Sequence, residues 1–158
     1  MSWWIYKCNN RQHDHQIAYG DWSEFFAEDA TSMWGSDRWV PALLRLVPGD
    51  LVIAYQTDRN ELVGITRVAY FEQIGEHNNL YLEPLEEIRV KVRPLKKRYR
   101  NVARIPALQS GPIKTIYEIS ERDARNLLRA SGSELAASVD DESESESELT
   151  FIEGERRA

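Results

Sequence analysis

The chain has 158 residues, a length typical of a single domain, and its 42% hydrophobic and 29% charged residues are ordinary for a globular protein. No apolar stretch is long enough to cross a bilayer, and the N-terminus lacks the pattern of a signal peptide. The one cysteine, Cys8, excludes an intrachain disulfide and a cysteine-rich zinc site. We therefore expect a cytoplasmic protein that has no membrane partner, no metal and no cofactor.

The net charge of −6 is unevenly distributed along the chain. Residues 131–158 hold nine acidic and two basic residues, which leaves residues 1–130 close to neutral. Alternating serine and glutamate cannot bury apolar surface, so we expect 131–158 to be a largely disordered acidic tail and 1–130 to be the folded domain. The apolar run 149–152 is compatible with docking on the domain, with docking on a partner, or with an unstructured end.

The first part of the chain predicts one strand and one short helix. Residues 2–7 are rich in aromatic side chains, as is typical of a strand. Asp21 followed by Glu24 has the form of a capping box, which predicts a helix that begins there. The stretches 9–20 and 29–41 show no clear period and predict loops.

Strand signals dominate the middle of the chain. After one or two helical turns over 41–46, residues 51–56 and 61–70 are β-rich runs that predict a hairpin. Residues 79–92 predict one long strand or two, with Pro84 at an edge or a bulge.

The last elements complete the predicted fold class. Residues 116–119 predict a final strand, and Ser120 with Asp123 predicts the cap of a closing helix. Several strands with short helices predict an α+β protein with a curled antiparallel sheet or barrel of about five strands.

Residues 89–104 hold eight basic residues and no acidic residue. A local basic stripe can contact phosphates even when the whole chain is acidic. Apolar and basic residues alternate over 88–93, which predicts one face toward the core and a basic face toward solvent. A solvated face without a ligand is the alternative. The candidates for contacts with a nucleic-acid backbone are Arg89, Lys91, Arg93, Lys96, Lys97, Arg98 and Arg100.

Four stretches within residues 3–128 occur in an order known from one protein family. They are residues 4–9 (WIYKCN), the pair Trp34-Gly35, the hairpin of 48–56 and 62–68, and the closing residues 111–113 and 119–120. Together they resemble the EVE domain, a member of the PUA-like group that is related to YTH domains. The family's corresponding motifs are aromatic-x-x-Lys-Ser-Glu-Pro, Trp-x-Gly and Gly-Asp-x-x-x-x-Tyr. The chain departs from them at Cys8-Asn9-Asn10, which replaces Ser-Glu-Pro, and at Gln56, where His is common.

The resemblance implies a fold that binds nucleic acid and a pocket that accepts a single flipped, often modified, base. EVE domains are associated with modified cytosine in DNA, and YTH domains read methylated adenine in RNA. Such a domain is a reader, so we expect no enzymatic activity. Nucleic acid is the expected partner, with modified DNA favoured over RNA. The alternatives are an RNA-binding PUA-like protein and a non-catalytic interaction module that recruits an effector protein.

A flipped base needs flat rings above and below it, hydrogen-bond partners at its edge and a basic rim. Trp34 is the candidate wall, Tyr55 the candidate second ring, and Asn9 the candidate for reading the base edge. The alternatives are a plug at the barrel end, a core tyrosine and a turn-forming asparagine. The further candidates for the pocket are Lys7, Cys8, Trp22, Trp39 and Gln56, of which the two tryptophans fit a core position better.

No catalytic or metal pattern competes with this interpretation. His13, Asp14 and His15 lack a recognisable zinc spacing, so we expect them to be loop residues at the mouth of the pocket. Asp50 and Glu61 do not form a nuclease signature, and the sequence has no phosphate-binding glycine loop and no nucleophile elbow.

Overall fold

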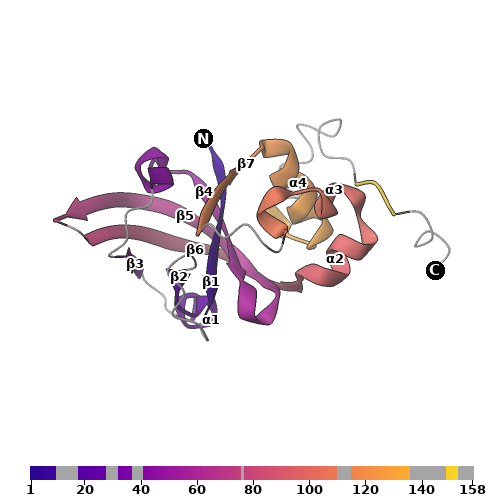
Figure 1. The fold of residues 1–158 in the computed structure, drawn as a ribbon, viewed down its shortest axis with the longest axis horizontal. Helices are drawn as coiled ribbons and strands as arrows, with labels where there is room; N and C mark the ends of the chain where they lie inside the picture. Colours follow the sequence, from indigo (N-terminus) through magenta and orange to yellow (C-terminus); the bar gives the residue numbers. More distant parts are fainter. Residues whose placement is uncertain are drawn as a thin grey trace.

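The computed structural model describes residues 1–9, 18–27, 32–36, 41–75, 77–109, 115–135 and 149–152. The strands within them are β1 (Trp3–Asn9), β2 (Ala18–Tyr19), β3 (Ser32–Ser36), β4 (Leu51–Gln56), β5 (Glu61–Ile74), β6 (His77–Lys91) and β7 (Ile116–Ile119). The α-helices are α1 (Trp22–Phe26), α2 (Val92–Arg98), α3 (Arg100–Ala103) and α4 (Glu121–Ala130), shown in Figure 1. Short 3-10 helices are η1 (Pro41–Arg45), η2 (Thr57–Arg59) and η3 (Pro106–Leu108).

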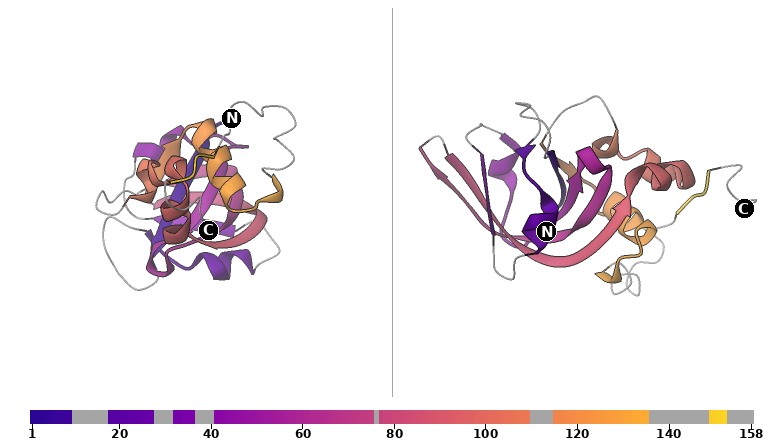
Figure 2. Two further views of the ribbon diagram at one scale, coloured as in Figure 1. Left: turned by 90° about the vertical axis from the view of Figure 1, so that its right-hand side faces the viewer. Right: turned by 90° about the horizontal axis from the view of Figure 1, so that it is seen from below.

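The strands form one curled, mixed sheet. They are hydrogen-bonded in the order β2-β1-β4-β5-β6-β3, and β7 also pairs with β1. β1 runs parallel to β2 and β4, whereas the other pairs are antiparallel. The long β5–β6 hairpin bends along its length, as Figure 2 shows, and its register shifts at three places. One shift adjoins the Thr66–Pro84 pair, an irregular position that suits a residue without an N–H.

The expected α+β class, with a curled sheet and short flanking helices, is confirmed. The predicted hairpin is present as β4 and β5, and the predicted strand over 79–92 is the single long β6. The described sheet has seven strands rather than about five. It also contains parallel pairs, because the long connection between β1 and β4 allows β4 to return in the direction of β1.

Two of the strands lie in stretches where we expected loops. β2 falls within 9–20 and β3 within 29–41. Both are short, and each forms through pairing with a distant strand, β1 in one case and β6 in the other. Their local sequence carries no period-two pattern, so tertiary pairing decides their conformation.

The two N-cap residues that the sequence predicts, Asp21 and Ser120, are the observed N-caps of α1 and α4. The Asp21 side chain accepts a hydrogen bond from the N–H of Ser23 at 2.8 Å at the start of α1. The Ser120 hydroxyl accepts one from the N–H of Asp123 at 3.0 Å at the start of α4. Each bond satisfies a backbone donor that the helix itself leaves without a partner. No helix among the described residues is both long and apolar enough to span a membrane.

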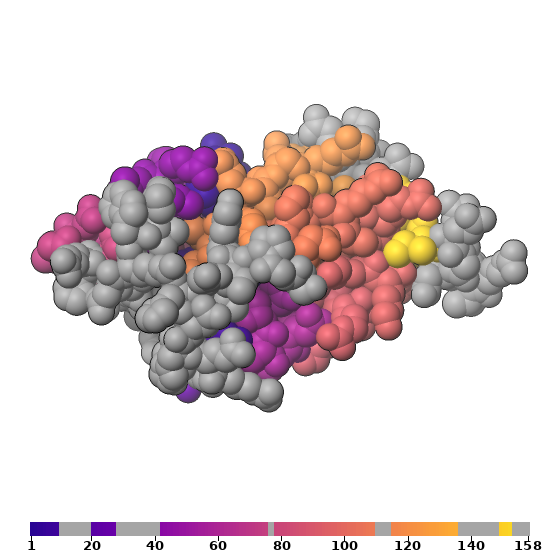
Figure 3. Space-filling view, in the orientation of Figure 1, coloured from indigo at the N-terminus to yellow at the C-terminus, as the bar shows by residue number. Residues whose placement is uncertain are grey.

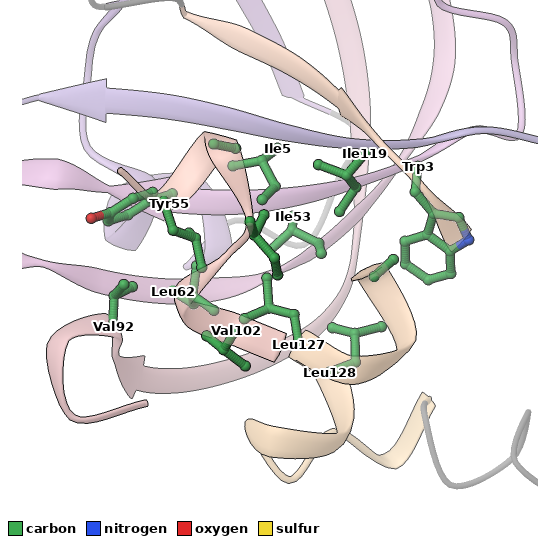
Figure 4. Close-up of a cluster of buried hydrophobic side chains, with 14 of the residues drawn as sticks. Trp3, Ile5, Ile53, Tyr55, Leu62, Val92, Val102, Ile119, Leu127 and Leu128 are labelled. Atoms are coloured by element: carbon green, nitrogen blue, oxygen red, sulfur yellow. The ribbon is translucent and has the colours of Figure 1, made fainter. Parts of the chain in front are cut away.

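Two hydrophobic cores lie on opposite sides of β1 and β4, because side chains alternate along a strand. The α4-side core includes Trp3, Ile5, Ile53, Tyr55, Leu62, Val102, Leu127 and Leu128 (Figure 4). The α1-side core includes Trp4, Tyr6, Cys8, Trp22, Phe25, Val52, Leu80 and Leu82. β1 contributes to both cores and is buried along its whole length.

The apolar run 149–152 docks on the domain, which is one of the three alternatives that its sequence left open. The N–H of Arg100 donates to the carbonyl of Thr150 at 2.7 Å, and the N–H of Ile152 donates to the carbonyl of Arg98 at 3.0 Å. Phe151 packs its ring 5.1 Å from that of Tyr99. The segment therefore lies against α2 and α3, where the yellow residues contact the body in Figure 3.

Candidate nucleic-acid interface

The outer edge of β1 changes partner at Lys7. β7 pairs with β1 as far as Tyr6, and the N–H of Lys7 donates to the carbonyl of Thr115 at 2.7 Å. From Cys8 onward, the same edge pairs with β2 instead. Two different strands therefore share this edge in succession, and we call the point where β7 is replaced by β2 the fork at Lys7.

Lys7 is a buried cation that lies over two aromatic rings. Its side-chain nitrogen is 4.7 Å from the ring centre of Tyr117 and 5.8 Å from that of Tyr55, while only 5% of the residue is exposed. Burial, and second the nearby charge of Lys96, together lower the pKa of Lys7 to about 8. The site therefore holds a weakly hydrated donor beside flat rings.

Tyr55 is the ring that sequence analysis assigned to the pocket. Its side chain belongs to the α4-side core, and its hydroxyl accepts a hydrogen bond from the Asn60 amide at 3.1 Å. Burial raises the pKa of Tyr55. The residue is thus a core tyrosine with a satisfied hydroxyl, and it also forms one wall beside the Lys7 ammonium.

The pocket candidates on β1 and β4 divide between the two faces of the sheet. Lys7 is paired with Tyr55, and Cys8 is paired with Gln56. Since side chains alternate, the first pair faces the α4-side core and the second faces the α1-side core. The alternation places Asn9, which is 8% exposed, on the side of Lys7. Lys7, Asn9 and Tyr55 can therefore share one site.

Gln56 has a structural role in the described part of the chain. It is fully buried, and its amide oxygen accepts from the N–H of Trp22 at 2.9 Å. Its amide nitrogen donates to the carbonyl of Gly20 at 3.0 Å and to the carboxylate of Asp58 at 2.6 Å. Both ends of the amide therefore hold α1 and η2 against the end of β4.

Trp22 and Cys8 are also embedded in the protein interior. Trp22 is fully buried, its ring meets those of Phe25 and Tyr6 edge to face at 5.1 and 5.7 Å, and its indole N–H donates to the Tyr6 carbonyl at 3.3 Å. The core position that we weighed for Trp22 is thus the observed one. Burial raises the pKa of the Cys8 thiol, which keeps it protonated and removes a thiolate nucleophile.

Other candidates lie wholly or partly outside the described residues. The backbone of Trp34 stands opposite Leu80 in the β3–β6 pair, but its side chain is outside what the structure describes. Trp39 and residues 13–15 are outside as well. Among the residues that are described, there is no group of three or more side chains that could hold a metal ion.

The basic residues of 89–104 differ in whether their charged groups contact other parts of the protein. Arg89 is ion-paired with Glu87 at 2.6 Å and with Glu61 at 3.2 Å. Lys96 donates to the carbonyl of Leu108 at 2.9 Å, and Arg98 lies over the rings of Phe151 and Tyr99. Of the seven candidates for backbone contacts, the exposed ones that form neither an ion pair nor a ring contact in the described part of the chain are Lys91, Arg93, Lys97 and Arg100.

Three of these cations line one cavity of about 370 Å³ on the surface. It is lined by Arg59, Asn60, Lys91, Arg93, Pro94 and Lys97. Arg59 and Asn60 belong to the turn between β4 and β5, and neither was predicted as a site residue. They come beside the basic stripe through the β5–β6 pairing, which sets Glu61 opposite Lys91 and was not predicted from the sequence.

No family model and no curated protein matches the chain. A structural-genomics crystal structure from Agrobacterium tumefaciens is similar with a TM-score of 0.61 and 12% identity, covering 84% of this chain and 94% of that one. An NMR structure from Rhodopseudomonas palustris has a TM-score of 0.60, 15% identity and the same two coverages. The YTH domain of the MRB1 protein of Zygosaccharomyces rouxii, in complex with N6-methyladenosine RNA, has a TM-score of 0.51 and 13% identity, covering 82% and 86%.

The chain has a PUA-like, YTH-like fold. The YTH domain and this chain share it over most of both lengths, in agreement with the group of folds that the sequence resemblance implied. At identities of 11–15% these likenesses concern the fold, and membership of the EVE family stays a prediction.

Proposed function

We propose that this protein is a non-enzymatic reader of nucleic acid that accepts one flipped, modified base, as the resemblance to EVE domains implies. The observation that carries the proposal is the shared fold with a YTH domain whose structure contains N6-methyladenosine RNA. The fork at Lys7 supports it, because the fork places a buried ammonium beside the rings of Tyr55 and Tyr117 at the end of β1.

The proposed recognition combines stacking with hydrogen bonds at the base edge. Each ring that stacks on a base contributes about 1–3 kcal/mol, which offsets the few kcal/mol needed to unstack the base. Lys7 donates only, whereas the amide of Asn9 both donates and accepts, so the two together can distinguish base edges. Trp34 stays the candidate wall of the pocket that the resemblance at Trp34-Gly35 implies.

We propose modified cytosine in DNA as the preferred ligand, following the association of EVE domains with that base. A methylated adenine in RNA is the second candidate, and the YTH domain bound to N6-methyladenosine RNA supports it. The two candidates differ in the base edge and in the 2′-hydroxyl, which a protein uses to distinguish RNA from DNA.

A binding titration with four matched oligonucleotides tests this proposal. The set comprises DNA with and without one 5-methylcytosine, and RNA with and without one N6-methyladenosine. We expect one modified member to bind more tightly than its unmodified partner, and we expect Trp34→Ala and Asn9→Ala to abolish that difference. Tyr70→Ala is the control, because Tyr70 is an exposed aromatic residue that stacks on Tyr81 in the β5–β6 hairpin. Equal binding of all four oligonucleotides contradicts base reading.

A further inference from the structure

We infer that the cavity between η2 and the start of α2 is a binding site for a phosphate group. Nucleic acid is the source of that phosphate if the protein is a reader, so this part of the inference rests on the proposed function. The presence of the site rests on the cavity itself, which is lined by Arg59, Asn60, Lys91, Arg93, Pro94 and Lys97.

The charges around the cavity are positive and largely available. Arg93 and Lys97 are exposed and have no acidic partner in the described part of the chain. The Lys91 ammonium donates one hydrogen bond, to the carbonyl of Arg59 at 2.9 Å, and keeps two donors. Arg59 itself is compensated by Asp21 at 2.5 Å. Among the described residues no acidic side chain lines the cavity, so an anion there meets three cations that form no ion pair.

The cavity wall is fixed by backbone hydrogen bonds. Asn60 is in the left-handed region, with a φ of 51°, and its carbonyl accepts from the N–H of Val92 at 2.8 Å. Its side-chain oxygen accepts from the N–H of Arg93 at 2.7 Å. The turn after β4 is thereby attached to the first residues of α2, and the cations are held on one rigid frame, which lowers the ordering cost of binding.

Asn60 also connects the cavity with the candidate base site. Its amide nitrogen donates to the hydroxyl of Tyr55, and the Tyr55 ring lies under the Lys7 ammonium. A volume of about 370 Å³ is at the small end of ligand sites, about 300–1,000 Å³, and suits a phosphate with part of its sugar. A strand whose base enters beside Lys7 would therefore place a neighbouring phosphate in this cavity.

The test is the double variant Arg93→Gln/Lys97→Gln, with Arg122→Gln as a matched control. Arg122 is an exposed arginine of α4 and has no ion pair in the described residues. Both proteins are titrated with the four oligonucleotides above and with inorganic pyrophosphate, and thermal unfolding checks that they fold. We expect the double variant to lose about tenfold in affinity for every oligonucleotide, which corresponds to about 1.4 kcal/mol, because two exposed cations that share one phosphate are removed. We also expect the slope of log affinity against log salt concentration to become shallower by about one, which corresponds to the loss of one phosphate contact.

The outcomes separate this inference from the proposed function. An unchanged ratio between modified and unmodified oligonucleotides, with weaker binding of both, supports a phosphate site beside a base reader. Equal binding of modified and unmodified oligonucleotides that the double variant still weakens supports the phosphate site and contradicts base reading. Pyrophosphate binding without oligonucleotide binding, lost in the double variant, assigns the site to a free phosphate compound. Unchanged affinities in the double variant, or the same loss in Arg122→Gln, overturn the inference.

Discussion

At the residue scale, neighbouring polar side chains of β1 and β4 have different roles because they face different sides of the sheet. Gln56 is bonded at both ends of its amide inside the α1-side core. Lys7 is buried on the other face, and its ammonium contacts aromatic rings. Lys7 has no acidic partner within the described residues, and a charge buried in this way is costly to the fold and often marks a functional site.

Lys7 should make stability depend on pH. Its pKa falls from 10.5 to about 8, first through burial and second through Lys96. Between these two values the unfolded chain binds more protons than the folded chain, so stability rises as pH increases through this window. Below about pH 8 the full cost of burying the charge is present. Lys7→Met removes that cost.

We expect Lys7→Met to be more stable than the parent protein at about pH 7 and to lose most of this advantage by about pH 10. Urea unfolding of the two proteins across this range measures the difference in their free energies of unfolding. Ionisation of the tyrosines is common to both proteins and cancels. An advantage of constant size would contradict the lowered pKa of Lys7.

Gly64 is a position where a side chain has no room. A Cβ atom there would lie 2.5 Å from the Phe26 ring and would also meet the carbonyl of Glu86. We expect Gly64→Ala to cost about 2 kcal/mol or more in chemical denaturation, because well-packed interiors do not accommodate an added methyl group. Gly75→Asn is the control: nothing lies near its Cβ position, and asparagine tolerates its positive φ of 59°. A similar loss in both variants would show that packing is not the cause.

At the scale of elements, Asn60 attaches the β4–β5 turn to α2. Asn60→Ala removes two side-chain hydrogen bonds and leaves a non-glycine residue at a positive φ, so we expect a loss of about 2–3 kcal/mol. Asn60→Gly removes the same bonds but relieves the backbone and should lose about 1 kcal/mol less. Thermal unfolding of both variants checks this order, and equal losses would argue against backbone strain.

The C-terminal segment Leu149–Ile152 is a second attachment between elements. A chain that ends at residue 148 lacks the carbonyl of Thr150, which accepts from the N–H of Arg100. We expect amide hydrogen exchange to accelerate at Arg100 and to stay unchanged at Tyr99, whose N–H donates within the body to Leu95. Unaltered exchange at Arg100 would mean that the segment is not docked in solution.

The sequence predicted the elements that carry their own pattern and missed those that depend on partners. The β4–β5 hairpin has β-rich runs on both sides of a turn, and α4 has a capping serine, so local rules identify them. β2 and β3 are two and five residues long and owe their conformation to β1 and β6. A prediction from local sequence patterns carries no information on which distant strands will pair.

At the scale of the whole molecule, the same limit applies to the candidate site. The resemblance at 4–9 and at the hairpin named Lys7, Asn9 and Tyr55 as pocket candidates, and the β1–β4 pairing sets Lys7 opposite Tyr55. Periodicity alone could not show that the Gln56 amide accepts a hydrogen bond from α1, or that Arg59 lines a cavity with residues of the basic stripe. Both depend on contacts between segments that are distant in sequence. The site is assembled by the curl of the sheet rather than by any one segment.

The measurement that tests this account most directly is the affinity of the intact protein for single-base-modified and unmodified oligonucleotides of otherwise identical sequence, by calorimetry at a fixed salt concentration. We predict a preference of about fourfold for one modified base, since an added methyl group in an apolar site contributes about 0.8 kcal/mol, whereas stacking is common to both bases and cancels in the ratio. Tight binding with no preference, or no heat with any oligonucleotide, would contradict the proposal that the end of β1 receives a base.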